Sequence, residues 1–299
     1  MTAPETYAPE TPQKKLSPPP LRDTKTPTYK APPGACDTHF HIYGPQVRFP
    51  LNPLSPYVFE DAGFDDLIKL HDTLGIARGV IVQSMAHGHS YEYMIDALCR
   101  APERLRGCAM PAPTITDREL EILDSVGVVA ARFAYRWSQE IDTRLLARIR
   151  EIGWHPQFWF RGEDEALAWR DTMLAVDGDF VIDHMGWQPA DKGIDAPGFR
   201  VVLDCLDTGR CWVKLSGPNR FTAGQDYPYP DTLPFAHELV RRAPERLLWG
   251  SDWPHPDHWE AMPNDGDLMD LFPEWVADET LRKMILSDNP AQLFGFDKV

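Results

Sequence analysis

Positive charge is scarce in this chain. Its 299 residues include 30 lysines and arginines against 45 aspartates and glutamates, so the formal net charge is −15. Nucleic-acid binders and basic membrane-surface proteins need a cationic face, so this balance argues against both kinds of partner. No apolar run approaches the roughly 20 residues of a membrane span, and the opening residues MTAPETYAPE do not resemble a secretory signal. We therefore expect a cytoplasmic protein.

Cysteine pairs and glycine-rich phosphate loops are also missing. The five cysteines include no CxxC pair, and their odd number does not fit a disulfide framework. We expect them to be reduced, buried thiols. No GxGxxG segment follows a predicted strand, which disfavours a doubly wound dinucleotide-binding sheet.

Large apolar residues are almost absent from residues 1–33, which hold nine of the 29 prolines. Such a segment cannot bury enough surface to offset its chain entropy, so we expect an extended N-terminal arm. The arm could strap across the body of the protein or across a neighbouring subunit, which makes a homodimer a reasonable hypothesis. The remaining residues, 34–299, match the usual size of a (β/α)8 barrel.

From Gly34 onward, short β-branched or apolar runs alternate with longer amphipathic segments, the pattern of βα units around a parallel sheet. Several helical segments end at a glycine such as Gly75, where a left-handed C-cap is least costly. Eight strands predict a TIM barrel, with an open doubly wound sheet as the alternative. The strands are expected at residues 35–43, 79–84, 106–111, 128–135, 157–160, 180–184, 212–216 and 247–251.

In a TIM barrel the active site lies at the carboxyl ends of the strands. Polar side chains follow six of the eight predicted strands, and their convergence predicts a catalytic site there. They are His39 and His41, Gln83 and His87, Arg132 and Arg136, Asp183 and His184, Lys214 and Arg220, and Asp252 and His255. Strand alternation is expected to turn Asp183 away from His184, toward the opposite face.

His39 and His41 lie two residues apart in DTHFHIYGP, a spacing that places both imidazoles on one face of a strand. Two such imidazoles can share a cation or polarise one oxygen. The alternative is a pair of structural histidines with satisfied hydrogen bonds. Combined with His184 after the sixth strand and Asp252 after the eighth, the motif favours a catalytic centre.

These motifs resemble the amidohydrolase superfamily. The resemblance runs from about residue 31 to the end. It is closer to the amidohydrolase-2 branch, which contains 2-pyrone-4,6-dicarboxylate lactonase and sulfomuconolactone hydrolase. HxH and SDWPHP are typical of the whole superfamily, whereas QSMAHG, DHMG and SGPNR favour the lactonase branch. The resemblance implies a (β/α)8 barrel and a hydrolytic activity.

The resemblance also implies roles for matching residues. Asp252 matches the general base that activates water, while His39, His41 and His184 match histidines that bind a metal in many relatives or the lactone carbonyl in others. One divalent metal, zinc, held by these four residues is the cofactor we expect, with metal-free catalysis as the alternative. Two of these histidines are enough to keep a nearby carboxylate charged.

Arginines are expected to bind the acidic groups of the substrate, because the planar guanidinium donates hydrogen bonds in pairs. The resemblance implies this role for Arg132 and Arg220, and Arg136 lies near a third arginine of the family whose spacing does not align. The alternative for each is an ion pair on the barrel surface. Further substrate-binding candidates near the strand ends are Gln83, His87, Lys214, Trp159 and His255.

The function we expect is hydrolysis of an unsaturated anionic lactone of the sulfomuconolactone or pyrone-dicarboxylate type, in aromatic-compound catabolism. Water activated by Asp252 would attack the lactone carbonyl. Two alternatives stay open. One is a metal-dependent decarboxylase of the same superfamily, and the other is a catalytically silent barrel used for binding.

Overall fold

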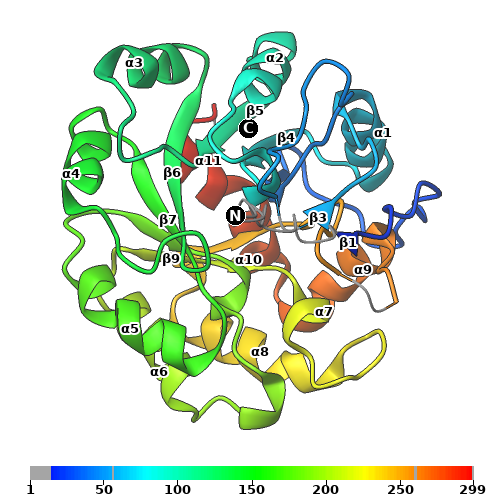
Figure 1. Cartoon of the computed structure of the whole chain (residues 1–299). Helices are drawn as coiled ribbons and strands as arrows, with labels where there is room; N and C mark the ends of the chain where they lie inside the picture. The colour runs from blue at the N-terminus through cyan, green and yellow to red at the C-terminus, as the bar shows by residue number, and fades with distance from the viewer. Residues whose placement is uncertain (1–14, 56, 259–260, 298–299) are drawn as a thin grey trace, which may run out of the picture.

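The computed structural model describes residues 15–55, 57–258 and 261–297. Its centre is an eight-stranded, all-parallel sheet in the order β10-β9-β8-β7-β6-β5-β4-β2 (Figure 1). The two end strands meet, because the Thr38 hydroxyl donates to the Trp249 carbonyl over 2.8 Å and the Asp252 amide donates to the His39 carbonyl over 2.8 Å. The sheet therefore closes into the predicted (β/α)8 barrel.

All eight predicted strands are present in the predicted order. Six of the strands are buried along their whole length and the other two are buried except at Arg106, Val129 and Phe133, as expected for strands covered on both faces. The strands are β2 Cys36–Phe40, β4 Arg78–Val82, β5 Leu105–Ala109, β6 Val128–Ala134, β7 His155–Trp159, β8 Phe180–Ile182, β9 Cys211–Leu215 and β10 Leu247–Trp249.

Amphipathic helices surround the barrel. In the first, Leu67, Leu70 and Leu74 form the buried stripe, and Gly75 ends the helix at φ 76°, the left-handed conformation predicted for it. The helices are α1 Phe64–Leu74, α2 Glu92–Arg100, α3 Asp117–Ser125, α4 Thr143–Glu151, α5 Gly162–Leu174, α6 Pro197–Asp207, α7 Pro218–Phe221, α8 Leu233–Arg242, α9 Asp265–Trp275, α10 Glu279–Lys283 and α11 Asn289–Phe294.

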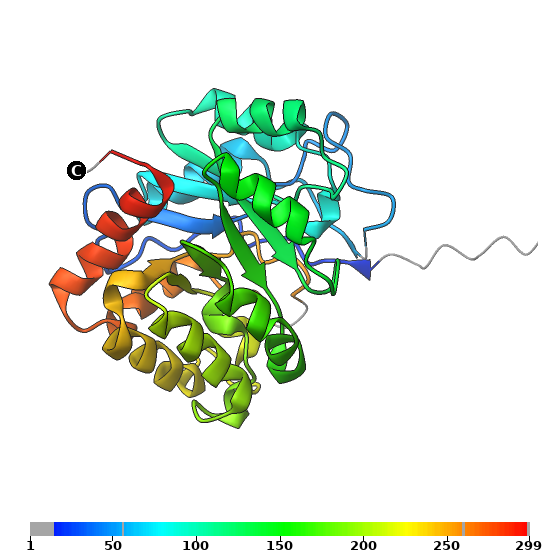
Figure 2. The same ribbon diagram turned by 90° about the vertical axis from the view of Figure 1, so that its left-hand side faces the viewer.

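Apolar side chains fill the amino-terminal end of the barrel interior. Cys36, Val80 and Trp212 from the strands pack there with Phe294 and Phe296, so the end of α11 closes this side. Figure 2 shows α11 and the short strand β1 at opposite ends of the barrel. The polar interior is left at the carboxyl end of the strands.

The cysteines follow the expectation with one exception. All five are free thiols and four are buried, but Cys99 on α2 is exposed, so the prediction that it is buried was wrong. Its position beside Arg100 places it on the solvent face of the amphipathic helix. None of the helices in the described residues is long and apolar enough to cross a membrane.

The described part of the N-terminal segment lies along the barrel. Its strand β1 (Lys15–Leu16) pairs in parallel with β3 (Tyr57–Val58), and the Tyr29 amide donates to Asp270 on α9 over 2.8 Å. The Lys25 ammonium also pairs with Asp267 of that helix. Residues 15–33 thus strap across their own chain. Residues 1–14 lie outside the described part, and the division at residue 33 stays a prediction.

Candidate active site

Three imidazoles and one carboxylate meet at the carboxyl end of the barrel. His39 lies one residue before the end of β2, His41 follows that strand, His184 begins the turn after β8, and Asp252 follows β10. The Nε2 atom of each histidine lies 3.7 Å from the same oxygen, Oδ1 of Asp252. All four side chains are buried. The structure therefore brings together the four residues that the sequence singled out as the catalytic centre.

The other ring nitrogen of each histidine is held by a neighbour. Nδ1 of His41 donates to the Val82 carbonyl over 2.6 Å, so Nε2 of the neutral ring carries a lone pair. Nδ1 of His184 lies 2.8 Å from the Ser216 hydroxyl. Burial lowers the pKa of both His41 and His184 to about 4, despite the opposing effect of Asp252, so both rings are neutral at pH 7.

This donor set fits a metal ion. A lone pair on His41 Nε2 facing an ionised carboxylate is repulsive unless a cation or a proton lies between them, and His39 Nε2 is buried without a hydrogen-bond partner among the described residues. Tetrahedral zinc with bonds of about 2.0 Å separates neighbouring ligand atoms by roughly 3.3 Å. The ligand atoms of His39, His41 and Asp252 all lie within 4.8 Å of one another, whereas His184 belongs to a second such group with His39 and Asp183, so His184 would have to move to bind the same ion. Outer hydrogen bonds at Nδ1 are the usual support of such ligands.

Arg220 keeps Asp252 charged. Its Nε donates to Asp252 Oδ2 over 2.7 Å, and its Nη1 donates to the Pro256 carbonyl over 2.6 Å. Burial alone would raise the pKa of Asp252, but Arg220 and the neighbouring His184 and His39 lower it far below its usual range. One carboxylate oxygen thus faces the histidines while the other is anchored.

A second charged group lies beneath the histidines. The Lys214 ammonium, wholly buried, donates to Gln157 Oε1 over 2.8 Å and lies 3.3 Å from Asp183 Oδ1. Asp183 Oδ1 is in turn 3.1 Å from His39 Nδ1, and Lys214 Nζ is 3.2 Å from the same nitrogen. Arg132 completes the group through Asp183 Oδ2 at 3.3 Å. Lys214, a substrate-binding candidate from the sequence, is thus paired with a buried acid.

The expectation that Asp183 faces away from the interior was wrong. Strand β8 ends at Ile182, and the chain enters a tight turn in which His184 and Met185 have positive φ of 52°. Asp183 itself keeps an extended backbone (φ −75°, ψ 147°), so alternation places it on the interior face with Val181, and the positive φ of His184 turns that side chain inward as well. Burial raises the pKa of Asp183, but Lys214 and Arg132 lower it, so its carboxylate stays ionised.

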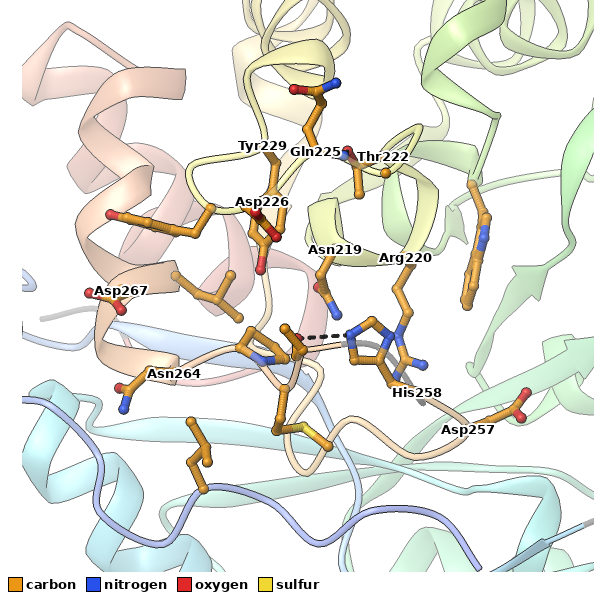
Figure 3. Close-up of a pocket in the computed structure, with 18 of the residues that line it drawn as sticks. Asn219, Arg220, Thr222, Gln225, Asp226, Tyr229, Asp257, His258, Asn264 and Asp267 are labelled. Atoms are coloured by element: carbon orange, nitrogen blue, oxygen red, sulfur yellow. Dashed lines mark hydrogen bonds between the residues drawn. The ribbon is translucent and has the colours of Figure 1, made fainter. Parts of the chain in front are cut away.

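Two connected cavities serve this centre. The inner pocket, lined by His41, His184 and Asp252 among others, has a volume of about 40 Å³. A chamber of about 870 Å³ lies outside it, between the loops after β7, β9 and β10, and is hereafter called the outer chamber (Figure 3). The two share four lining residues: Arg161, Trp187, Arg220 and Asp257.

The arginines have different surroundings. Arg132 lines the inner pocket, yet its guanidinium is paired with Asp183. Arg136 lies at the outer chamber with 53% of its side chain exposed and pairs with Glu165 at 3.6 Å. Arg161, which the sequence analysis did not propose, lines both cavities. Its one sequence signal is its place directly after the fifth predicted strand.

The remaining substrate-binding candidates differ in whether they line a cavity or only contact neighbouring parts of the fold. Trp159 lines the inner pocket. Gln83 joins two loops, donating to the Gly88 carbonyl over 2.7 Å and accepting from the Met110 amide over 2.7 Å. His87 is stacked on Tyr93 at 3.7 Å between ring centroids and lines neither cavity. His255 Nε2 lies 3.1 Å from Asp265, while its amide donates to the Asp252 carbonyl over 2.8 Å.

Fold and site together define a barrel enzyme with a histidine and aspartate centre at its strand ends. The amidohydrolase model Amidohydro_2 matches residues 36–296, and the chain belongs to this family. Its sequence is 38% identical to 4-sulfomuconolactone hydrolase of Rhizobium radiobacter, over 90% of this chain and 92% of the relative. It is 35% identical to the 2-pyrone-4,6-dicarboxylate hydrolase of Comamonas testosteroni, over 91% and 94% of the two chains.

A solved structure is similar over nearly the same range. It is a probable 2-pyrone-4,6-dicarboxylic acid hydrolase from Acinetobacter baumannii with citric acid bound, 26% identical, with a TM-score of 0.78, over 88% of this chain and all of that chain. These relatives support an enzyme of the lactone-hydrolysing branch, as the sequence motifs had predicted.

Proposed function

We propose that this chain hydrolyses an unsaturated lactone that carries carboxylate or sulfonate groups. The observation that carries the proposal is the convergence of His39, His41 and His184 on Oδ1 of Asp252, each at 3.7 Å, in a pocket that also contains arginines. The relatives that share 35–38% of this sequence are named as hydrolases of such lactones.

The reaction adds water across the acyl–oxygen bond of the ring. Asp252 is ionised and accepts a proton from the attacking water, whose oxygen bonds to the carbonyl carbon. The ring C–O bond then breaks, and the leaving oxygen takes up the proton from Asp252. Arg220 holds the base in position throughout, since it anchors Oδ2 and leaves Oδ1 directed at the water site.

One zinc ion is the cofactor that these side chains suit best. The residues that would hold it are His39, His41, His184 and Asp252. When bound, it supplies a Lewis acid for the carbonyl oxygen and lowers the pKa of water to about 7. Metal-free catalysis, with the histidines in direct contact with the carbonyl oxygen, is the alternative. A cytoplasmic location and a homodimer also stay predictions.

Elemental analysis of the purified protein tests the metal, combined with lactone opening followed before and after chelation. The substrates are 2-pyrone-4,6-dicarboxylate and 4-sulfomuconolactone. About one zinc per chain and activity that is lost on chelation and restored by zinc are expected. Undiminished activity in metal-free protein would refute the zinc site while leaving the hydrolase intact.

Product analysis separates hydrolysis from the decarboxylase alternative. Mass spectrometry should show a product heavier than the lactone by one water, with no carbon dioxide released. Carbon dioxide without ring opening would overturn the proposed reaction. The identities of 35–38% with lactone hydrolases favour the first outcome.

A further inference from the structure

The inner pocket is too small for the substrate. Its volume of about 40 Å³ has room for a few water molecules, whereas small-molecule sites commonly span about 300–1,000 Å³. The outer chamber has about 870 Å³ and shares the wall formed by Arg161, Trp187 and Arg220. A lactone with its carbonyl at Asp252 would then place its substituents beside these three side chains, at the outer chamber.

Arg161 stands at the junction of the two cavities. Its guanidinium carbon lies 4.1 Å from the Trp187 ring centroid and 4.9 Å from that of Trp159, so two indoles fix its plane. Only Nη2 is committed to a carboxylate, that of Asp257 at 3.2 Å. Nε is buried without a partner among the residues the structure describes. The guanidinium is thus preorganised and retains donors for another anion.

Asn219 is the second unusual side chain of the outer chamber. It is 7% exposed, and neither its amide nitrogen nor its amide oxygen has a hydrogen-bond partner within the described part of the chain. Buried amides without partners are rare in folded proteins and call for an explanation. Figure 3 shows Asn219 directed to the same side as Arg220 and toward His258.

Three acidic residues line the outer chamber beside its arginines. Asp257 is the existing partner of Arg161, Asp267 is paired with Lys25 of the N-terminal segment, and Asp226 lies on the loop after β9. Arg220 also reaches the chamber, with its guanidinium carbon 5.5 Å from the Trp187 ring centroid. By contrast Arg136, the arginine suggested by the sequence, is half exposed and already paired with Glu165.

We propose that Arg161 and Asn219 bind a second acidic group of the lactone, a carboxylate or sulfonate that takes no part in the reaction. The outer chamber is then the subsite that selects doubly anionic lactones over singly anionic ones. This inference rests on the proposed function, because it assumes that the lactone carbonyl lies at Asp252.

The test is an Arg161→Met variant assayed on matched substrates, 2-pyrone-4,6-dicarboxylate with 2-pyrone-6-carboxylate and 4-sulfomuconolactone with muconolactone. A charge-assisted contact is expected to be worth about 10- to 100-fold in kcat/KM. The loss should fall on the dianionic lactone through KM, while the monoanionic lactone changes less than about 2-fold. Asn219→Ala should give a smaller loss with the same selectivity.

The matched control is Arg200→Met, which removes a half-exposed arginine paired with Asp195 at the surface. Equal losses on both members of a substrate pair would show a merely structural role and overturn the inference, as would no loss on the dianionic lactone in either variant. If Arg161→Met does not fold, Asn219→Ala alone decides by the same criterion. A wild-type protein that opens no lactone refutes the proposed function instead, whereas one that opens both members equally well refutes only the subsite.

Discussion

The inner pocket and the outer chamber are built from different parts of the fold. Residues at or just after strand ends supply the catalytic part of the inner pocket, where His41, His184 and Asp252 are each held by a neighbouring group. Loops supply most of the outer chamber, together with Leu21 of the N-terminal segment. The comparison shows that the catalytic residues are held by buried contacts, whereas the outer chamber is lined by loops. Changes in these loops can alter which substrate binds without disturbing the barrel.

Charge also differs between the two regions. At the inner pocket and just beneath it, the cationic side chains of Arg132, Lys214 and Arg220 pair with the carboxylates of Asp183 and Asp252. Because the histidines there are neutral, this cluster has a net positive charge. The whole chain has a formal net charge of −15. A local cationic cluster is what an acidic protein needs to hold an anionic substrate against its own field.

The largest expected effect comes from Asp252→Asn. The amide cannot accept the proton from water and loses the ionic pair with Arg220, whose Nε is 2.7 Å from Oδ2. We expect kcat to fall by at least about 10³-fold with a smaller change in KM. Steady-state kinetics on the lactone that the wild type hydrolyses best measures this, with zinc content determined for each preparation.

Asp195→Asn is the control for that variant, because Asp195 is exposed and paired only with Arg200 in the described structure. It should retain the wild-type kcat. If Asp252→Asn kept kcat within tenfold of the wild type at equal zinc content, Asp252 would not be the base.

Lys214→Met probes the buried layer under the histidines and should have the next largest effect. The substitution leaves Asp183 buried without the ammonium at 3.3 Å and removes the donor to Gln157. Breaking a buried ion pair in this way typically costs about 3–5 kcal/mol of unfolding free energy. Loss of support for His39 should also lower kcat about 10- to 100-fold.

Chemical denaturation and steady-state kinetics measure the two effects of Lys214→Met separately. The exposed Lys192→Met variant is the matched control, and both of its values should equal those of the wild type. An unchanged unfolding free energy in Lys214→Met would contradict a charged, paired ammonium in the barrel interior.

The sequence predicted the barrel well because most strands are short, buried and largely apolar runs between amphipathic segments. It also predicted His39, His41, His184 and Asp252, since residues at strand ends must meet at one end of a barrel. Asp183 was misjudged because His184 was taken as part of the strand, whereas His184 has positive φ and only Asp183 follows the alternation from Val181. The β8 boundary depends on a tight turn with positive φ, which no local pattern in VIDHMG indicates.

Arg161 shows a different limit of prediction from the sequence. Its importance depends on two indoles, one at the end of β7 and one on the loop after β8, and on the boundary between two cavities. None of these relations has a periodic signal in the sequence. Arg136, one strand earlier, looked equally suitable and is half exposed beside Glu165. Sequence spacing therefore separates site arginines from surface arginines poorly when they lie on loops, whereas it identifies site histidines at strand ends well.

The smallest expected effect concerns stability and a histidine outside both cavities. His87 lies between Tyr43 and Tyr93, and burial lowers its pKa from 6.5 to about 3. Between these two values the unfolded chain binds a proton that the folded chain does not, so stability is lost as the pH falls below about 6.5. The expected slope from one such histidine is about 1.4 kcal/mol per pH unit.

His87→Phe should retain the aromatic stacking and remove the one proton that His87 binds in the unfolded chain but not in the folded chain. The dependence of the unfolding free energy on pH between 6 and 4.5, measured by denaturant titration, should then be shallower than in the wild type by about 1.4 kcal/mol per pH unit. Protonation of any metal ligands affects both proteins equally, so it cancels in the difference. His237→Gln, at an exposed position, is the control and should retain the wild-type slope. Equal slopes for His87→Phe and the wild type would mean that His87 is protonated in the folded chain, and the stacked, buried ring would then need a charge partner that the described structure does not provide.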